Sequence, residues 1–463
     1  AAAWRRIVAE RRRSQCASSR VLEERCAAVC DICVCLAGCK LVIRTTSSPC
    51  CVALGTFVVV APLRETARWL NCEAWGGLAT TTTWGGVMGG GGWLSGGPMS
   101  GADSGHPFSL QQSFRAAERH ERAVLGMGHP LLDISAWVSQ STLDTYGLEL
   151  DNQILAEEKH AGLFKELASH AGVEYIAGGA TQNSIRVAQW MLQTPGATSY
   201  MGCVGKDEYA DKMTEVCTKD GVKVAYQIAE GVATGTCGVC IKDGERSLVA
   251  NLAAADEFQV SHVMRPENWR LVEDAKIVYS AGFFMTTSPD TIKLVSEHCS
   301  KSSAIYCLNL SAPFLMEVAA FKATLVATLP NVDFLFGNAN EARTFAKTEG
   351  WPTGDVAEIA ARVASMPKSN GSRCRTVVFT QGMDATILAH NGQIKVYPVT
   401  PVEKKDLVDT NGAGDAFVGG FLSQLVCGKS LDECVRAGHY AATVIIQQSG
   451  CKFPSRPSFS WTA

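Results

Sequence analysis

The feature that most constrains this chain is the heptad Asp-Thr-Asn-Gly-Ala-Gly-Asp at positions 409–415. It follows a strand-like stretch, Asp406–Val408, and precedes an apolar helical run, Ala416–Leu425. Two glycines around a small residue let several backbone N–H groups point outward together where the helix begins, which makes a seat for phosphate. Asp415 falls in the first helical turn, where a carboxylate gains roughly 0.3–1 kcal/mol. We therefore expect Asp415 to be ionised at neutral pH.

An anion seat beside a carboxylate indicates phosphoryl transfer. The heptad predicts that Asp415 takes a proton from a hydroxyl group while the backbone amides of Gly412, Ala413 and Gly414 hold the migrating phosphoryl group. A glycine-rich turn before a helix is also a common plain connector, so the turn alone does not decide the function.

The heptad as a whole resembles the signature of the ribokinase-like family of sugar and nucleoside kinases. From about Ala123 to Pro454, further runs resemble the adenosine kinase branch of that family. They lie at positions 126–128, 130–135, 153–156, 177–179, 181–184, 234–237, 247–248, 250–255, 281–284, 308–314 and 336–338. The resemblance implies a three-layer αβα sandwich with a mostly parallel sheet and a small β-rich lid.

The pattern of the chain agrees with an α/β fold. Apolar strand-like runs such as Ser199–Val204, Ala304–Leu310 and Thr376–Thr380 alternate with helical stretches such as Ala156–Ala171 and Gln182–Leu192. Such alternation predicts a parallel sheet that binds ligands beyond the carboxyl ends of its strands.

Four short strand-like segments do not fit this alternation, and we expect them to form the lid. They are Leu132–Val138, Tyr226–Ile228, Gly235–Ile241 and Ser247–Asn251. The predicted kinase domain is therefore 123–463, with a lid formed by about 131–155 and 223–252. A lid excludes water, which would otherwise take the phosphoryl group.

The resemblance assigns the ribose site to two stretches of the chain, one at positions 129–133 and one at positions 178–183. Asp133 is expected to accept hydrogen bonds from the 2′ and 3′ hydroxyls, and Asn183 to add a side-chain bond. Gly178 and Gly179 would let the backbone approach the sugar. His129 stands where the family typically has Asn, so we expect a change in affinity or in pH dependence, because histidine titrates near neutrality.

The adenine pocket needs aromatic faces and few hydrogen bonds. The resemblance implies that Phe284 and Phe314 stack on the base, with Gln153, Leu155 and Cys237 as lining. Phenylalanine in an apolar run is also a common core residue.

The nucleotide site follows from the same resemblance. Asn338 and Glu341 match an Asn-x-x-Glu element that organises Mg²⁺ and phosphates, often through water, although Glu341 could also merely counter a helix dipole. Arg246 resembles a lid arginine that covers the transferring phosphate; the alternative is a solvated surface arginine. The region that holds ATP would include Thr380, Gly382, Asn411 and His439.

The first 122 residues differ from the rest. They hold nine of the nineteen cysteines, thirteen arginines against one lysine, and a glycine-rich tract at 85–101. The first methionine is Met88, so this extension reads as upstream sequence that is not translated, or as a truncated targeting segment. Its one Cys-x-x-Cys has no second pair at zinc-finger distance, which argues against a zinc site.

Charge and hydropathy exclude several classes of partner. The formal net charge is −3, which offers no overall basic field for nucleic acid or anionic membrane. No run of eighteen apolar residues occurs. We expect a cytoplasmic monomer, with organelle targeting only if residues 1–87 belong to the native protein.

The sequence therefore predicts ATP-dependent phosphorylation of the adenosine 5′-hydroxyl to AMP, with Mg²⁺ and with Asp415 as the base. Two alternatives stay open. One is a kinase for another nucleoside or a free sugar, against which Phe284 and Phe314 argue. The other is a nucleoside-binding protein without catalysis, against which the intact heptad argues.

Overall fold

The computed structural model describes residues 121–150, 152–243 and 245–459. The predictions for the extension, residues 1–122, lie almost wholly outside this range. In the described part, a nine-stranded sheet has the order β16-β15-β14-β13-β12-β11-β1-β5-β7. Its strands are β1 (Val124–Met127), β5 (Thr198–Met201), β7 (Lys223–Val224), β11 (Ile277–Ala281), β12 (Ile305–Asn309), β13 (Phe334–Asn338), β14 (Thr376–Gln381), β15 (Asp384–His390) and β16 (Gln393–Tyr397).

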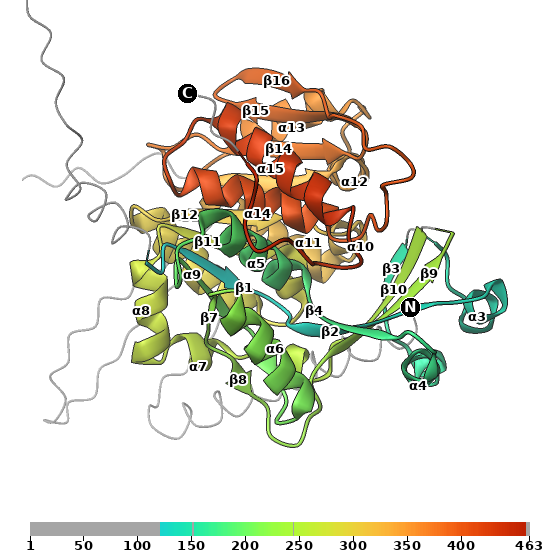
Figure 1. The fold of residues 1–463 in the computed structure, drawn as a ribbon. Helices are drawn as coiled ribbons and strands as arrows, with labels where there is room; N and C mark the ends of the chain where they lie inside the picture. Colours follow the sequence, from blue (N-terminus) through green and yellow to red (C-terminus); the bar gives the residue numbers. More distant parts are fainter. Residues whose placement is uncertain (1–120, 151, 244, 460–463) are drawn as a thin grey trace, which may run out of the picture. The chain divides into compact units, whose positions relative to one another are not determined.

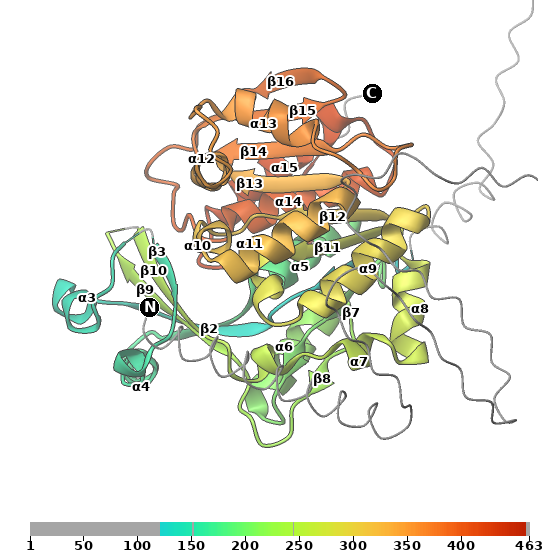
Figure 2. The ribbon, with the colours of Figure 1, turned by 180° about the vertical axis from the view of Figure 1, so that it is seen from behind.

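The strands from β7 to β14 run parallel, and only β15 and β16 pair antiparallel at one edge. Helices cover both faces of this sheet (Figures 1 and 2). One face carries α5 (Ala180–Leu192), α6 (Glu208–Lys219), α14 (Ala413–Leu425) and α15 (Leu431–Ile445). The other carries α8 (Pro266–Asp274), α9 (Pro289–Lys301), α11 (Ala319–Thr328), α12 (Ala339–Thr348) and α13 (Val356–Ala364). The predicted three-layer αβα architecture is confirmed.

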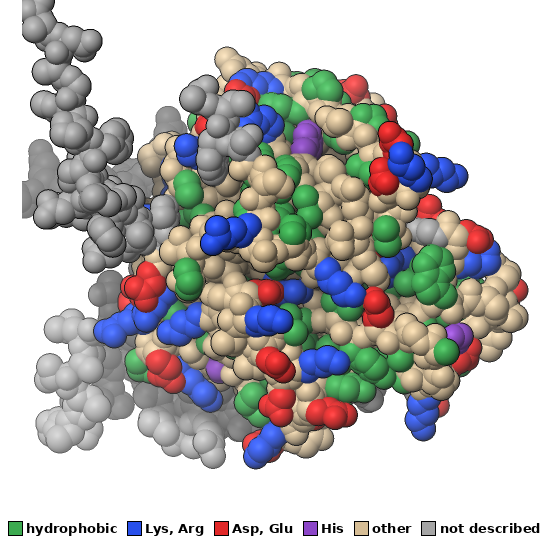
Figure 3. Space-filling view, in the orientation of Figure 1, with side chains coloured by type: hydrophobic (Ala, Val, Ile, Leu, Met, Phe, Trp, Pro, Cys, Tyr) green, Lys and Arg blue, Asp and Glu red, His purple; other side chains and the backbone are tan. Residues whose placement is uncertain are grey.

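Short elements complete the body. They are α7 (Val260–Val263), α10 (Phe314–Glu317), η2 (Ala253–Glu257), η3 (Gly282–Thr286) and η4 (Leu329–Asn331). Among the residues described, none of the helices combines the length and the apolar composition that crossing a bilayer requires. In Figure 3, acidic and basic side chains are interspersed over the face shown, in keeping with the small net charge.

Aromatic side chains pack helix α14 against the sheet. The ring of Phe421 lies edge-to-face on Phe334 and Phe336 of β13, with centroids 5.8 and 5.2 Å apart. At Gly419, a Cβ would lie 2.4 Å from the carbonyl oxygen of Ser184, so only glycine lets α14 come this close to α5. The start of α14 therefore lies beside the start of α5.

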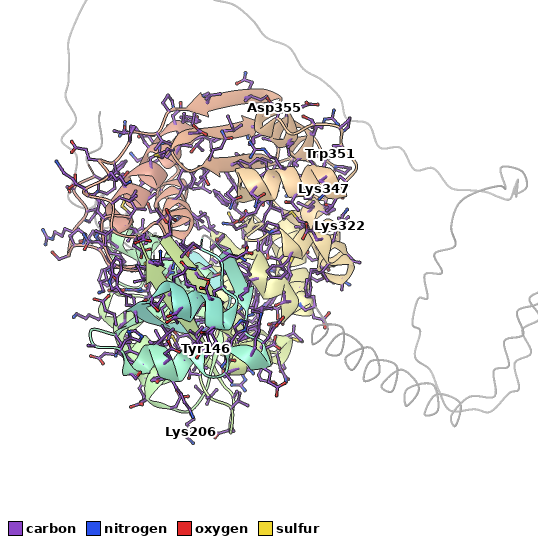
Figure 4. All side chains as sticks on the ribbon, turned by 90° about the vertical axis from the view of Figure 1, so that its right-hand side faces the viewer. Tyr146, Lys206, Lys322, Lys347, Trp351 and Asp355 are labelled. Carbon is purple, nitrogen blue, oxygen red and sulfur yellow. The ribbon has the colours of Figure 1, made fainter. Side chains whose placement is uncertain are left out.

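A second sheet forms the lid, with strand order β3-β10-β9-β2-β4. Its strands are β2 (Leu131–Trp137), β3 (Asn152–Leu155), β4 (Glu174–Gly178), β9 (Thr236–Lys242) and β10 (Glu245–Asn251), and it stands to one side of the large sheet (Figure 1). Helices α3 (Gln140–Tyr146) and α4 (Leu163–Ser169), with the short turn η1 (Glu158–His160) before α4, cover one face. The hydroxyl of Tyr146, labelled in Figure 4, donates to Glu166 Oε2 of α4 at 2.9 Å.

Two details of the predicted lid were wrong. The segment Tyr226–Ile228 does not join it: β8 (Gln227–Ile228) pairs with β6 (Cys203–Val204) in a separate two-stranded sheet. The reason is the side chain of Tyr226, which packs on Tyr200 at 6.0 Å and donates its hydroxyl to Gln182 of α5 at 2.5 Å. Strand β4, by contrast, was not predicted to belong to the lid.

The strand-like approach predicted at Asp406–Val408 is a loop. The chain leaves the edge strand β16 and reaches α14 through residues 398–412. The N–H groups of Val408 and Asp409 both donate to the carbonyl of Ile446, at 2.9 and 3.0 Å. The heptad is therefore placed by the end of α15, because its backbone bonds are made there and not in the sheet.

Candidate active site

A cavity of about 1360 Å³, open to solvent, lies between the lid and the carboxyl ends of the parallel strands. Sixteen of the residues predicted for the site line it. They are His129, Asp133, Gln153, Leu155, Gly179, Asn183, Cys237, Phe284, Phe314, Asn338, Glu341, Thr380, Asn411, Gly412, Gly414 and Asp415. These residues come from both sheets and from α5 and α14, so the fold brings distant parts of the sequence together.

The heptad forms the loop that starts α14. Gly412 has φ +77°, the left-handed conformation that favours glycine, and α14 begins at the next residue. Asp409 is fully buried and anchors the loop: its Oδ1 accepts from the Asn411 N–H at 2.9 Å and its Oδ2 from the Gly450 N–H at 2.7 Å. Ala413 does not line the cavity, and its N–H donates to the Thr410 carbonyl at 3.3 Å.

Asp415 faces the cavity from the first turn of α14, where its Oδ2 accepts a hydrogen bond from Asn183 Nδ2 at 3.2 Å. Burial raises the pKa of Asp415 to about 7; the bond from Asn183 opposes this rise and the nearby charge of Glu341 adds to it. The expectation that Asp415 is ionised at neutral pH was wrong, because with a pKa of about 7 the carboxyl group is only partly ionised there. Loss of solvation outweighs the helix dipole, which contributes only roughly 0.3–1 kcal/mol.

Asp133 lies on β2 and is buried in the cavity wall. Burial raises its pKa to about 7, while the charge of Arg246 works in the opposite direction. Gly178 does not line the cavity but lies directly behind this carboxylate, because a Cβ there would be 2.4 Å from Asp133 Oδ2. Gly179 has φ +95°, and a Cβ there would meet the carbonyl oxygen of His129 at 2.1 Å.

Arg246 is not on the surface. Its side chain is 5% exposed and pairs with the fully buried Asp409 of the heptad. Arg246 belongs to β10 of the lid, so this pair joins the lid to the loop before α14. The alternative of a solvated surface arginine was therefore wrong, and Arg246 does not line the cavity in this conformation.

His129 is buried in the cavity wall. Its Nε2 lies 2.8 Å from Thr287 Oγ1, and its ring meets Phe284 edge-to-face at 5.8 Å. Burial lowers the pKa of His129 to about 4. The expectation that this histidine titrates near neutrality was wrong, because an enclosed imidazole loses the solvation that its charged form needs.

Beside the predicted Phe284 and Phe314, the cavity wall contains the neighbouring Phe283. The ring of Phe283 lies 6.2 Å from that of Phe314. Phe284 is fully buried and meets Phe258 edge-to-face at 5.2 Å. The two neighbours lie in the short helix η3, whose turn places both rings at the cavity. Phe283 lies in the run 281–284 that resembles the kinase family, but it was not assigned to the site.

Other lining residues were missed as well. Gly128, Thr181, Leu248, Phe336 and Phe417 contribute to the wall. The hydroxyl of Thr181 accepts from the Ala281 N–H at 3.0 Å, so it joins α5 to the end of β11. Four of them, Gly128, Thr181, Leu248 and Phe336, lie within runs that resemble the kinase family, but they were not assigned to the site.

Asn338 and Glu341 cap helix α12. Glu341 Oε2 accepts from the Asn338 N–H at 2.9 Å, and Oε1 accepts from Asn338 Nδ2 at 2.8 Å. Burial raises the pKa of Glu341 to about 7. Both oxygens already accept a hydrogen bond, so the carboxylate suits a Mg²⁺ bound through water better than one bound directly. The described residues contain no cluster of three or more His, Cys, Asp or Glu that could hold a metal ion.

Two of the residues predicted for the ATP region lie outside the cavity wall. Gly382 occupies the turn between β14 and β15 with φ +63°. His439 lies on α15, where its Nε2 is 2.9 Å from Thr386 Oγ1 and its ring packs on Phe417 at 5.6 Å. Phe417 itself lines the cavity, so His439 lies one residue behind the wall.

The sequence profile of the pfkB family carbohydrate kinases matches residues 141–458. The chain belongs to this family. As a pfkB family kinase it is a phosphotransferase with an alcohol acceptor, and its mostly parallel sheet with a β-rich lid is the ribokinase-like fold. The cavity between lid and sheet is thus the natural place for its chemistry.

Related pfkB proteins include adenosine kinase 1 of Arabidopsis thaliana, 55% identical over 74% of this chain and 100% of that protein. Adenosine kinase of Dictyostelium discoideum is 42% identical over 72% of this chain and 96% of that protein. Among solved structures, Anopheles gambiae adenosine kinase in complex with P1,P4-di(adenosine-5) tetraphosphate has a TM-score of 0.71 at 44% identity, covering 73% of this chain and 99% of its own. Schistosoma mansoni adenosine kinase with adenosine in an occluded loop conformation has a TM-score of 0.70 at 34% identity, with the same coverage.

Proposed function

We propose that this chain is an adenosine kinase, which transfers the terminal phosphoryl group of ATP to the 5′-hydroxyl of adenosine and yields AMP and ADP. The observation that carries the proposal is that Asp133 and Asp415 face one cavity whose wall also contains Phe283 and Phe314. A carboxylate for a diol, aromatic rings for a base and a carboxylate beside a helix N-terminus are what a nucleoside kinase needs. The high identity to relatives named adenosine kinase supports the choice of nucleoside.

The nucleoside is proposed to lie between the lid and α5. Asp133 accepts hydrogen bonds from both vicinal hydroxyls of the ribose, since an ionised carboxylate has two acceptor oxygens. Gly179 exposes backbone at the sugar, and Asn183 reaches it from α5. The rings of Phe283, Phe284 and Phe314 lie against the base in this proposal. The lid residues Gln153, Leu155 and Cys237 close over it.

Asp415 is proposed as the general base. Its ionised form accepts the proton of the 5′-hydroxyl while the hydroxyl oxygen forms its bond to the γ-phosphorus and the bond from this phosphorus to the β–γ bridging oxygen breaks. The proton ends on Asp415 and the leaving group is ADP. Asn183 keeps the carboxylate oriented through its bond to Oδ2.

The migrating phosphoryl group is proposed to sit at the N-terminus of α14. The backbone N–H groups of Gly412 and Gly414, which line the cavity at this helix start, would donate to it, and the helix dipole adds to their effect. Arg246 would join them by leaving Asp409 as the lid moves, because a phosphate carries more charge than the carboxylate it replaces. Ala413 supplied the remaining amide of the predicted anion hole. In this proposal it contributes as the first residue of α14.

ATP is proposed to occupy the end of the cavity formed by Asn338, Thr380 and Asn411, with Gly382 and His439 just beyond its wall. Mg²⁺ would be held by phosphate oxygens and water, with Glu341 binding one of these waters, and when bound it neutralises charge on the phosphates. The kinase domain is proposed to span 123–463, with the five-stranded sheet as its lid. A cytoplasmic monomer is the accompanying expectation from the sequence.

A substrate panel tests the proposal. The purified chain is incubated with Mg-ATP and, separately, with adenosine, guanosine, uridine and free ribose, and AMP and ADP are quantified by chromatography. We expect one AMP for each ADP with adenosine, and much slower turnover with the other acceptors. Preferred phosphorylation of ribose or of another nucleoside, or adenosine binding without AMP formation, would refute the proposal.

A further inference from the structure

Three polar side chains near the cavity have no role in the reaction proposed above beyond the lining that His129 provides: His129 and Thr287 are buried, and Asp256 is half-buried. His129 lies in the connection between β1 and β2, Thr287 follows η3, and Asp256 belongs to η2. His129 Nε2 is 2.8 Å from Thr287 Oγ1, and this hydroxyl donates to Asp256 Oδ1 at 2.6 Å. The three side chains form a continuous hydrogen-bonded relay that ends at the cavity.

The relay determines the direction of each bond. A threonine hydroxyl has a single hydrogen, and a carboxylate can only accept. Since the hydrogen of Thr287 goes to Asp256, the hydrogen of the other bond must come from His129 Nε2. The imidazole therefore carries a proton on Nε2.

The second ring nitrogen is then free of hydrogen. Burial lowers the pKa of His129 to about 4, so the ring is neutral at physiological pH and carries only one proton. Nδ1 is left with a lone pair, which is a hydrogen-bond acceptor.

This acceptor is accessible from the cavity. His129 lines the cavity, and its hydrogen bond to Thr287 is made through Nε2, which leaves Nδ1 for another partner. Nδ1 is also not one of the polar atoms that the described part of the protein seals off without a partner. A ligand in the cavity can therefore reach it.

We infer that Thr287 and Asp256 are positioning residues that hold His129 as a hydrogen-bond acceptor, with Nδ1 offered to an O–H or N–H group of the substrate. The identity of the substrate rests on the proposed function, whereas the tautomer does not. An asparagine at position 129 would need no relay, since its amide can turn either its oxygen or its nitrogen to the ligand. An imidazole has no such freedom once Nε2 is bonded. Thr287 and Asp256 therefore decide whether Nδ1 of His129 is a donor or an acceptor.

The tautomer is measured directly by ¹⁵N NMR of the full chain labelled at histidine, with His129→Asn identifying the signal of His129. We expect the ligand-free protein to carry the proton on Nε2. Thr287→Val removes the acceptor and should leave a mixture of tautomers. Asp256→Asn should shift the population toward Nδ1–H, because an amide at 256 can donate to Thr287, which then donates to Nε2. A proton on Nδ1 in the unsubstituted chain would overturn the inference.

Kinetics test the contribution to binding. Thr287→Val should raise KM for adenosine about tenfold and change kcat less than about threefold, since a buried acceptor loses its orientation. In the His129→Asn background the same substitution should change KM less than about twofold. Thr328→Val is the control: this buried hydroxyl donates to the Thr324 carbonyl within α11, away from the cavity, and KM should not change. An equal cost of Thr287→Val in both backgrounds would contradict the relay.

Substrate analogues identify the donor. 2′-Deoxyadenosine, 3′-deoxyadenosine and N6,N6-dimethyladenosine each lack one O–H or N–H set. For the analogue that lacks the hydrogen accepted by Nδ1, Thr287→Val should no longer raise KM. If Thr287→Val raises KM fully for all three analogues, the acceptor role is refuted. If the chain fails to phosphorylate adenosine at all, the proposed function falls, and the NMR measurement still decides the tautomer.

Discussion

The side-chain amide of Asn183 donates to Oδ2 of Asp415 at 3.2 Å, across 232 positions of sequence. The contact exists because α5 and α14 lie side by side, and Gly419 removes the Cβ that would keep them apart. The bond stabilises the ionised carboxylate and opposes the rise in pKa that burial causes. Asp415 is thereby held near the protonation balance that suits a general base at neutral pH.

The first prediction is a dependence of turnover on the ionisation of Asp415. Only the ionised carboxylate can accept a proton, so kcat should rise as pH increases through about 7 and then level off. Initial rates at saturating adenosine and Mg-ATP, from about pH 5.5 to pH 9, measure this limb. A kcat that is constant or falls between about pH 6 and pH 8 would contradict it.

Removing the side-chain amide of Asn183 should shift the pH dependence of kcat. In Asn183→Ala, Asp415 loses the bond that lowers its pKa, so the midpoint of the kcat profile should shift to higher pH. At about pH 9 most of the turnover should return, because the carboxylate is ionised again. A midpoint that stays in place or moves to lower pH would show that the bond does not tune Asp415.

Gly178 gives a test of the diol site. In Gly178→Ala the new methyl group would lie 2.4 Å from Asp133 Oδ2, so the carboxylate must move away from its position. We expect KM for adenosine to rise tenfold or more, with a smaller change in kcat, since about 1–3 kcal/mol of hydrogen bonding is lost. Gly354→Ala is the matched control, because nothing lies within 4 Å of a Cβ there and its KM should be unchanged. An equal KM for both variants would argue against Asp133 as the ribose ligand.

The pair of Arg246 and Asp409 gives a test of how the lid is attached. Arg246→Met leaves the carboxylate of Asp409 buried with only its two backbone donors, which should lower the free energy of unfolding by roughly 3–5 kcal/mol. Adding Asp409→Asn removes the unpaired charge, and urea unfolding should show that part of the loss is recovered. If the double variant is less stable than Arg246→Met, the pair is not coupled in this way.

Much of the site could be predicted because its residues lie in local patterns. The heptad predicted a helix with Asp415 in its first turn, and α14 begins at Ala413 with Asp415 in that turn. Asn183, Phe284, Phe314 and Glu341 each stand near a strand end or a helix start, and the parallel sheet collects these ends at one edge. Asp133 joins them from β2 of the lid. The resemblance then selected which of them share the cavity.

The parts that were missed depend on contacts between distant residues. The partner of Arg246 is Asp409, which no local pattern connects to the lid. Tyr226 leaves the lid because its ring and hydroxyl find Tyr200 and Gln182 in the body. The charge state of Asp415 was wrong for the same reason: the helix dipole can be read from position, whereas the depth of burial cannot.

The most direct measurement of the central claim is the rate of phosphoryl transfer in Asp415→Asn, followed as AMP formation in a single turnover with saturating adenosine and Mg-ATP. Asparagine keeps the size of the side chain and its contact with Asn183, so the fold and adenosine binding should be retained, as circular dichroism and calorimetry would show. The account predicts a rate at least about 10²-fold below that of the unsubstituted chain, at every pH. A folded, adenosine-binding Asp415→Asn variant that transfers phosphate at nearly the original rate would contradict it.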